Sequence, residues 1–495
     1  MGRIRTHSQA PLAVVLAGVF MIVLDFFIVN VMLPSMQSGL HASSGEIEWV
    51  IASYGITFAG FLITAGRLGD RYGRRRMLLL GMTLFTVSSL TCGVAPGVTT
   101  LIAARALQGV GAAMMSPNVL SIIGVTYTGQ ARVRALRTYA LVMGLAAVGG
   151  QVIGGILLQA DLAGLGWRSC FLINIPVGIA ALALAPVLVR ESRSEDAQRP
   201  DVVGMVLVSL GLIAIVLPLI EGRQLGWPAW SWVLLASAPA WLCTFVLHER
   251  LVIRRGGAPL LDLGLFRVRA FSSGLLTQCA FWCQQAASYL ALALYLQEGR
   301  GLSPLDSGLV FTILAAAYLA VSLRAPALTV RLGRDLIALG AGLLVAGYVL
   351  IAAAALYGNV HGGVLIFAPG LLLVGAGQGL CITPLTVTVM SALDPARAGS
   401  ASGLLSTMQQ VGNSIGVAFT GVILFGLLDS GFDKAFAASA GEFAALAALV
   451  IALTRLMPRP PHARDAGSVR WGASLRTRRS RIEPRSLRAG GTGSR

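Results

Sequence analysis

Long runs of apolar residues, each with few polar interruptions, recur from one end of the chain to the other. A helix needs about 20 apolar residues to cross a hydrocarbon core of about 30 Å. The runs are too long, and too rich in Leu, Ala and Gly, for the alternating strands of about ten residues that build an outer-membrane barrel. The pattern therefore predicts an all-α polytopic membrane protein with fourteen spans, at residues 11–34, 49–66, 77–95, 100–123, 137–158, 168–189, 202–220, 230–248, 270–296, 307–327, 336–357, 363–390, 400–428 and 440–457.

Basic residues are concentrated in every second loop between these runs. If the amino terminus is cytoplasmic, the inner loops carry, among others, the arginines within 67–76, 132–137, 190–199 and 250–269. The outer loops carry only Arg168, Arg223, Arg300 and Lys434. Cytoplasmic loops of membrane proteins are enriched in Lys and Arg. The asymmetry therefore predicts a multi-pass protein of the plasma membrane with both termini in the cytoplasm.

The composition excludes several other classes of protein. Hydrophobic residues make up 56% of the chain and charged residues 12%, and the net charge of +17 comes mostly from arginines in the short inner loops, so we expect no nucleic-acid partner. The single lysine, Lys434, rules out the phosphate-binding loop of an ATP-driven pump. No HExxH motif and no CxxC pair occurs, so we expect no enzyme, no metal and no cofactor.

A weak internal repeat divides the chain. LQGVGAAMMSPNVL (107–120) and LVGAGQGLCITPLTV (373–387) both place glycines two positions apart before a proline. Each is the fourth span of a set of six if spans seven and eight are an inserted hairpin, and repeated halves are typical of transporters. We therefore predict a six-helix bundle at 1–190, an inserted hairpin with its linkers at 191–268, a second six-helix bundle at 269–457 and a disordered, arginine-rich cytoplasmic tail at 458–495.

Four segments resemble a known family. GRLGDRYGRRR (66–76) resembles the signature loop of the major facilitator superfamily. LDFFIVNVMLP (24–34), LIAARALQGVGAAMMSP (101–117) and GWRSCFLINIPVG (166–178) resemble motifs of its fourteen-helix drug:proton antiporters of the EmrB/QacA type. The resemblance implies the major facilitator fold, with two six-helix bundles and an inserted pair of helices.

The resemblance also implies a function. We expect a monomeric exporter in the lipid bilayer that works by alternating access, takes up protons and expels drugs, antibiotics or other amphipathic small molecules. Two alternatives stay open, namely a dedicated exporter or importer of one small metabolite and a membrane sensor that transports nothing. A channel would leave the two related halves unexplained.

Asp25 is the candidate for proton coupling, because it is the only acidic residue far from the ends of every predicted span. Asp25 lies fourteen residues beyond Pro11, or about 21 Å into the membrane, and Arg105 lies at a similar depth on the fourth span. Burial favours the protonated form of Asp25, whereas a neighbouring arginine favours the charged form. Binding of substrate could therefore shift the balance between the two forms and release a proton. The resemblance assigns coupling to Asp25 and Arg105; the alternative is a fixed ion pair with Asn30 nearby.

The loop at 66–76 is the candidate for a conformational latch. Gly66, Gly69 and Gly73 permit close approach and tight turns. Asp70 can accept hydrogen bonds from Arg74 or from the free amides at the start of a helix. The resemblance implies an inner latch, including Arg71, that holds the two halves together in the outward-facing state. The alternative is that the arginines only fix topology.

The fifth span predicts a close contact between helices. Gly150 and Gly154 have the GxxxG spacing, and Gly155 follows directly. The segment resembles the antiporter motif of exporting family members, which has a proline where this chain has Gln151. Gln151 is therefore either a polar group of the cavity or an interhelical hydrogen-bond partner.

Two polar stripes are candidates for the substrate cavity. Gln278, Trp282, Gln285 and Tyr289 follow one face of the ninth span. The thirteenth span adds Gln410 and Asn413, and the first adds Asn30. Amides are costly in lipid, so both stripes should face protein or water. Aromatic rings beside amides suit an amphipathic or aromatic solute, although the same side chains could only join helices.

Overall fold

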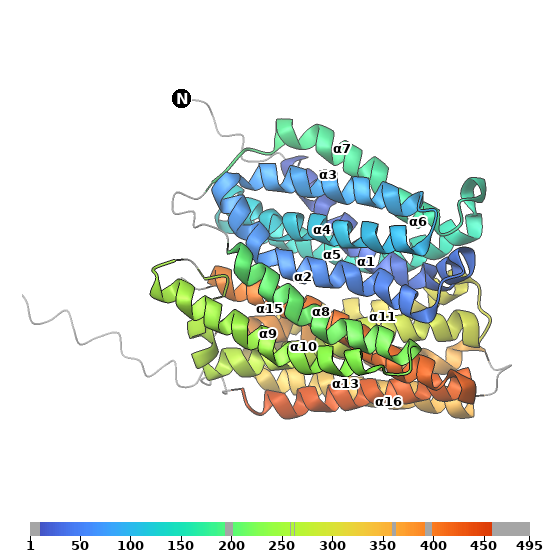
Figure 1. Cartoon of the computed structure of the whole chain (residues 1–495). Helices are drawn as coiled ribbons and strands as arrows, with labels where there is room; N and C mark the ends of the chain where they lie inside the picture. The colour runs from blue at the N-terminus through green and yellow to red at the C-terminus, as the bar shows by residue number, and fades with distance from the viewer. Residues whose placement is uncertain are drawn as a thin grey trace, which may run out of the picture. The chain divides into compact units, whose positions relative to one another are not determined.

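The computed structural model describes residues 10–193, 201–257, 259–261, 263–358, 363–391 and 398–457 (Figure 1). Within these ranges the regular structure is helical throughout, with no strand. The tail expected at 458–495 lies outside the described residues.

The first six predicted spans form seven helices. They are α1 (Ala10–Leu40), α2 (Ser44–Tyr72), α3 (Arg74–Gly93), α4 (Val98–Thr126), α5 (Gly129–Ala160), α6 (Arg168–Leu172) and α7 (Asn174–Leu188). Ser43 starts α2 with a capping box to Glu46, and Gly73, at φ 117°, lets α2 stop and α3 begin without an intervening loop. In this half α4 packs on α2 and α3, and α1 packs on α5 and α7.

The next two spans form a helical hairpin. Its helices are α8 (Val202–Gln224) and α9 (Ala229–Arg254). They pack on each other, and α8 also packs on α2 and α15. The hairpin therefore lies against the line where the two halves of the chain meet.

The remaining described residues form the second set of helices. They are α10 (Arg269–Leu294), α11 (Pro304–Ser322), α12 (Ala325–Leu332), α13 (Arg334–Tyr357), α14 (Ala368–Ser391), α15 (Ala398–Gly426) and α16 (Phe432–Thr454). A π-helical turn at Tyr295–Gly299 extends α10. Here α13 packs on α14 and α16, and α10 packs on α15 and α16.

The described helices support fewer spans than the sequence predicts. Eleven are long and apolar enough to cross a membrane, or twelve if α2, which bends by 49° after Leu62, counts as one span. The expectation of fourteen is therefore not confirmed. Helices α10 and α15, predicted spans nine and thirteen, are absent from that set. Their buried amides, including Gln278, Gln285 and Gln410, lower their hydropathy.

One expectation about acidic residues is wrong. The final span was expected at 440–457, but α16 begins at Phe432. Glu442 is therefore ten residues, or about 15 Å, inside its helix, so Asp25 is not the only acidic residue far from a helix end. Asp433 and Lys434 conceal the start of α16 in the sequence, because charged residues at a helix terminus resemble a loop.

The two halves meet through α2 against α15 and α5 against α11. Backbones of the two halves come into direct contact toward the end where α1 stops and α2 starts. A Cβ added to Gly155 would lie 2.7 Å from Leu305 Cα and 2.8 Å from the Pro304 carbonyl oxygen, and one on Gly308 would lie 2.6 Å from the Gln151 carbonyl oxygen. The backbones are thus in direct contact at the end that the sequence predicts to be outer.

Gly155 tests whether this contact holds the outer end closed. We expect Gly155→Leu to shift the population away from the closed outer end, because backbone atoms of Pro304 and Leu305 cannot move aside as a flexible side chain can. Spin labels at Ser38 and Asp306, in a background without accessible native cysteines, should then report a longer mean distance. Gly149→Leu on the same helix, where the nearest atom is Ile153 Cδ1 at 3.5 Å, should leave the distance unchanged. Equal distances in the wild type, Gly155→Leu and Gly149→Leu would show that the contact at Gly155 does not hold the outer end closed.

Candidate functional site

A buried ion pair joins α1 to α4. Arg105 Nη1 donates a hydrogen bond to Asp25 Oδ2 at 2.5 Å. The side chain of Asp25 has no exposed surface, and that of Arg105 is 2% exposed. The structure therefore brings together the two residues that the sequence placed at similar depth.

Amide side chains complete the first contacts of Asp25. Gln108 Nε2 donates to Asp25 Oδ1 at 2.8 Å, and Asn174 Nδ2 donates to the same oxygen at 3.3 Å. Gln108 Oε1 in turn accepts from Arg105 Nη1 at 2.7 Å. Hydrogen bonds to a carboxylate favour its charged form, so three side chains oppose the cost of burying the charge.

Sequence reasoning missed Gln108 and Asn174, although both lie inside the quoted segments 101–117 and 166–178. Gln108 is three residues after Arg105, which places it on the same helix face, and this spacing is the signal that could have found it. Nothing in the sequence alone brings Asn174 to Asp25, since that contact depends on how α7 packs against α1.

Asn30 does not partner Asp25 in this structure. Its Nδ2 donates to the Phe26 carbonyl oxygen at 3.1 Å, within its own helix. Asn30 instead lines a small pocket together with Arg105, Gln410 and Asn413.

Tyr54 connects the ion pair to a larger cavity. The guanidinium carbon of Arg105 lies 4.3 Å from the centre of the Tyr54 ring, a cation–π distance. Arg105 Nε also donates to the Val50 carbonyl oxygen at 3.0 Å. Tyr54 itself lines the larger cavity, so a molecule bound there can contact a residue that touches the arginine.

The larger cavity has a volume of about 250 Å³ and lies between the two halves. It is lined from the first half by α1, α2, α4 and α5, and from the second by α10, α11, α14 and α15. Gly55 of α2 packs on Ser414 of α15, just as Gly155 of α5 packs on α11. Leu62 and Tyr139 line the cavity and lie further from the outer end of these two helices than Gly55 and Gly155 do. The cavity therefore lies on the side of the interhalf contacts that faces the 66–76 loop.

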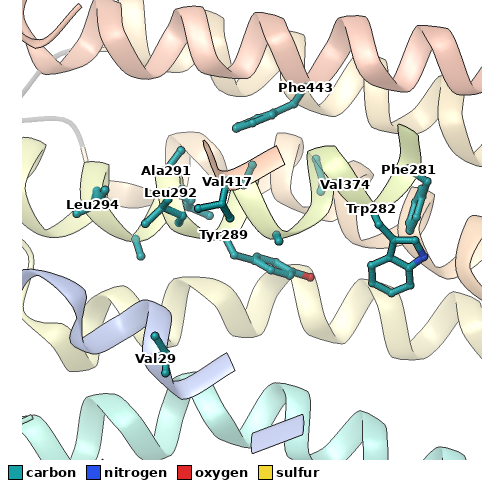
Figure 2. Close-up of a cluster of buried hydrophobic side chains, with 14 of the residues drawn as sticks. Val29, Phe281, Trp282, Tyr289, Ala291, Leu292, Leu294, Val374, Val417 and Phe443 are labelled. Carbon is teal, nitrogen blue, oxygen red and sulfur yellow. The ribbon is translucent and has the colours of Figure 1, made fainter. Parts of the chain in front are cut away.

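Most of the predicted cavity residues line this space. They are Gln151, Trp282, Gln285, Tyr289, Gln410 and Asn413. Figure 2 shows the rings of Trp282 and Tyr289 projecting from the same side of α10. Gln278 is buried but does not line the cavity, because it lies one turn from Trp282 toward the start of α10.

The cavity wall combines aromatic rings with amides that have unused hydrogen-bonding capacity. Phe26, Phe27, Phe58, Phe311 and Tyr318 also line it. Seven lining atoms are buried and have no hydrogen-bond partner among the described residues: Tyr54 Oη, Gln151 Nε2 and Oε1, Trp282 Nε1, Gln285 Oε1, Gln378 Nε2 and Asn413 Oδ1. No charged residue lines the cavity in the part of the chain that the structure describes. Such a wall suits an uncharged aromatic molecule with a few polar groups.

Gln378 is a third residue that sequence reasoning missed. Its Oε1 accepts a hydrogen bond from the Tyr289 hydroxyl at 2.8 Å, so it fixes one of the aromatic rings of the cavity. The residue lies in the repeated segment 373–387, which was noted only for its glycines and proline.

Two glycines of the fifth span pack against α1. A Cβ on Gly150 would lie 2.9 Å from Phe27 Cβ, and one on Gly154 would lie 2.8 Å from Ile28 Cγ1. Gly155 instead approaches α11, so the three glycines serve two different interfaces. Gln151, between them, lines the cavity.

Residues 66–76, expected from the sequence to be a loop between spans, instead form the end of α2 and the start of α3, joined at Gly73; they keep the name 66–76 loop here. They form contacts within the first half and with the linker after α9. Arg74 donates to Asp70 Oδ1 through Nε at 2.9 Å and Nη2 at 2.7 Å. The free amides at the start of α3 are occupied by another residue, because Glu191 accepts from the backbone amides of Arg75 at 3.0 Å and Arg76 at 3.1 Å. Of the two partners predicted for Asp70, the structure thus shows Arg74.

The other residues of the loop pack closely on the first half. A Cβ on Gly66 would lie 3.5 Å from Pro117, and Gly69 lies against Asn118. Arg71 stacks over Tyr72 at 5.5 Å. The contacts that the structure describes for Asp70 stay within its own loop, which leaves the latch between the halves a prediction.

Comparisons with known proteins identify relatives of the whole membrane region. The profile of the Major Facilitator Superfamily matches residues 15–417. The chain is 39% identical over 425 residues to a protein named probable actinorhodin transporter of Streptomyces coelicolor, covering 85% of this chain and 73% of that one. It is 35% identical over 410 residues to multidrug resistance protein Stp of Mycobacterium tuberculosis, covering 82% and 74%. It is 33% identical to the cephamycin export protein CmcT of Amycolatopsis lactamdurans, covering 93% and 94%.

Solved structures share the fold. A POT family transporter in complex with 5-aminolevulinic acid superposes with a TM-score of 0.64 at 17% identity, covering 90% of this chain and 96% of that one. A bacterial homologue of the lysosomal transporter Spinster, described as inward-facing and unoccupied, gives a TM-score of 0.65 at 16% identity, covering 92% and 98%. At these identities the likeness is one of fold alone.

Substitutions in α10 test whether the cavity binds aromatic molecules. We expect Trp282→Ala to weaken binding of uncharged aromatic compounds by roughly tenfold, the loss of about one aromatic contact. Gln285→Ala should weaken binding mainly of compounds that carry hydrogen-bond donors, since Gln285 Oε1 is an unused acceptor. Binding of a compound panel to the purified protein, followed by thermal shift, would measure both.

Gln278→Ala is the matched control, because Gln278 lies on the same helix outside the cavity. Gln278→Ala can lower the melting temperature of the protein, but the compounds should keep the same order of affinity. If Trp282→Ala and Gln285→Ala weaken every compound to the same extent as the control does, the α10 stripe only joins helices.

Proposed function

Because the chain belongs to the Major Facilitator Superfamily, we propose that it is an efflux transporter that exports drugs, antibiotics or other amphipathic small molecules in exchange for protons. The names of its relatives support export, since they include multidrug resistance protein Stp and the cephamycin export protein CmcT. Family membership also agrees with the expectation that the chain is a transporter and not an enzyme.

The cavity supports an uncharged aromatic substrate. Its rings offer contact area, its amides offer a few hydrogen bonds, and no charged lining residue among those described would need a counter-ion on the solute. A molecule with an ionised group would lose hydration without gaining a charged partner. A cavity with this lining should therefore bind neutral, flat molecules more tightly than charged ones.

The contact of Tyr54 with Arg105 carries the proposal of proton exchange. Protonation of Asp25 removes the negative charge that holds Arg105 and leaves the guanidinium with Gln108, the Val50 carbonyl and the Tyr54 ring. A solute in the cavity would contact Tyr54, which lines it. The solute, through Tyr54, and the proton, through Asp25, would thus act on the same arginine and could compete without sharing a site.

Alternating access is supported by where the halves touch. The interhalf contacts at Gly155 and Gly308 close one end, and the cavity lies toward the end with the 66–76 loop. We propose that this is the inward-facing state, with both termini cytoplasmic in the plasma membrane. In the opposite state, the Asp70 loop would meet the second half and act as the latch that the sequence predicts.

We further propose that α10 and α15 also cross the bilayer, giving the fourteen spans of the EmrB/QacA branch and a monomeric transporter. Both helices pack among other spans, α10 against α15 and α16 and α15 also against α2 and α8. Their amides are therefore covered by protein, and low hydropathy does not prevent such a helix from spanning.

A second candidate is the export of a single compound. The relative named probable actinorhodin transporter is named for one molecule, whereas Stp is named for several. A susceptibility panel in a host without its own pumps separates the two, since resistance to one chemical class alone would favour dedicated export.

Asp25→Asn tests proton exchange. We expect the variant to lose uphill, pH-driven accumulation of a fluorescent neutral dye in inside-out vesicles, because an amide cannot exchange a proton. Binding of the dye to purified protein should persist, since Asp25 does not line the cavity. Asp335→Asn, whose carboxyl is 68% exposed, is the matched control and should transport normally. Accumulation that still follows the pH gradient in Asp25→Asn would exclude Asp25 as the proton carrier.

A further inference from the structure

The inserted hairpin brings three potential metal ligands together at one end. Asp201 directly precedes α8, and His248 and Glu249 lie in the last two turns of α9. One ligand atom from each residue lies within 4.8 Å of the other two. None of the three lines the cavity or belongs to the Asp25 network.

The imidazole and one carboxylate are already in contact. His248 Nε2 lies 2.9 Å from Asp201 Oδ1 and 3.2 Å from Oδ2. Asp201 Oδ1 also accepts from the Gly204 amide at 2.9 Å, which fixes the carboxylate at the start of α8. The His248 side chain is 24% exposed and the Asp201 side chain 7%, so the cluster can be reached through the histidine.

Glu249 points an unused oxygen into this cluster. The residue has no exposed surface, and its Oε2 accepts from the Leu261 amide at 2.9 Å. Its Oε1 meets no N–H or O–H donor among the described residues and faces the Asp201 carboxylate, with which it can share a proton. A Cβ on Gly204 would lie 2.5 Å from Asp201 Oδ2 and 2.7 Å from Glu249 Oε1, so both carboxylate oxygens converge over this glycine.

Converging buried carboxylates need a positive partner between them. Arg67 acts on both by its charge, but its guanidinium donates to the Pro259 and Leu260 carbonyl oxygens. A shared proton or a metal ion between Glu249 Oε1 and Asp201 Oδ2 would remove the remaining repulsion between the two carboxylates. The neighbouring imidazole nitrogen makes the donor set one nitrogen and two oxygens.

We infer that Asp201, His248 and Glu249 form a binding site for a divalent transition-metal ion such as Zn²⁺. Zinc takes imidazole and carboxylate ligands at about 2.0–2.2 Å and often keeps one further position for water. Mg²⁺ and Ca²⁺ prefer sets of oxygen ligands only and are disfavoured by the imidazole. Glu249 Oε1, unused otherwise, becomes a ligand.

A bound ion would fasten the hairpin to the helix that carries the 66–76 loop. Glu249 holds the Leu261 amide, and Arg67 holds the carbonyls of Pro259 and Leu260 in the same stretch of chain. Arg67 lies three residues before Asp70 on α2. The ion thus ties α8 and α9 to each other and, through residues 259–261, to α2.

Zinc titration of the full-length, tag-free protein in detergent, after treatment with chelator, tests the site. We expect Zn²⁺ to raise the melting temperature of the wild-type protein, and Mg²⁺ at the same concentration not to do so. His248→Gln should weaken Zn²⁺ binding by at least about tenfold, because it removes the only nitrogen ligand. His41→Asn, which changes an exposed histidine with a positive φ, is the control and should bind as the wild type does.

Asp201→Asn is a second test of the site in case the histidine variant does not fold. Asparagine can still cap α8 through its side-chain oxygen, but it loses the charge of the ligand. It too should weaken Zn²⁺ binding while keeping the metal-free melting temperature near that of the wild type. A wild-type protein with no zinc-dependent shift would overturn the site and leave a shared proton between the carboxylates. A shift that persists in both variants would overturn it as well.

Discussion

The carboxylate of Asp25 has no exposed surface, and three side chains of the first half oppose the cost of burying its charge. Arg105 supplies the opposite charge, Gln108 and Asn174 supply hydrogen bonds, and these come from α4 and α7, two of the helices that contact α1. Breaking such a pair by removing one partner typically costs about 3–5 kcal/mol, because the other charge is left buried alone. The packing of these helices and the state of the ion pair therefore cannot vary independently.

The same pair reaches the substrate cavity through a single aromatic ring. Tyr54 stacks on Arg105 and lines the cavity, while Gln410 and Asn413 of the second half line both the cavity and the small pocket beside Arg105. In the proposed mechanism, a change in the charge of Asp25 would thereby affect the residues where the two halves meet. Tight packing at Gly155 and Gly308 makes that interface either closed or separated, which is how a small local change can become a change of access.

Sequence reasoning found the charged residues because they are expensive in an apolar segment: Asp25 and Arg105 stand out against their neighbours, and they do meet. It missed Gln108, Asn174 and Gln378, since an amide among small residues gives no signal until the packing is known. Glu191 caps α3 from more than 110 residues away along the chain, a partnership that only the fold reveals. The start of α16 was misplaced because Asp433 and Lys434 resemble a loop, and this concealed the depth of Glu442.

Proton release upon substrate binding tests the central claim most directly. Purified protein in weakly buffered detergent solution, followed with a pH indicator across a series of starting pH values, would be titrated with a neutral aromatic substrate. The account predicts release of up to one proton for each substrate bound, at pH values where Asp25 is protonated, and none from Asp25→Asn at equal occupancy. Binding without release at every pH, or equal release from the variant, would contradict competition through the Asp25–Arg105 pair.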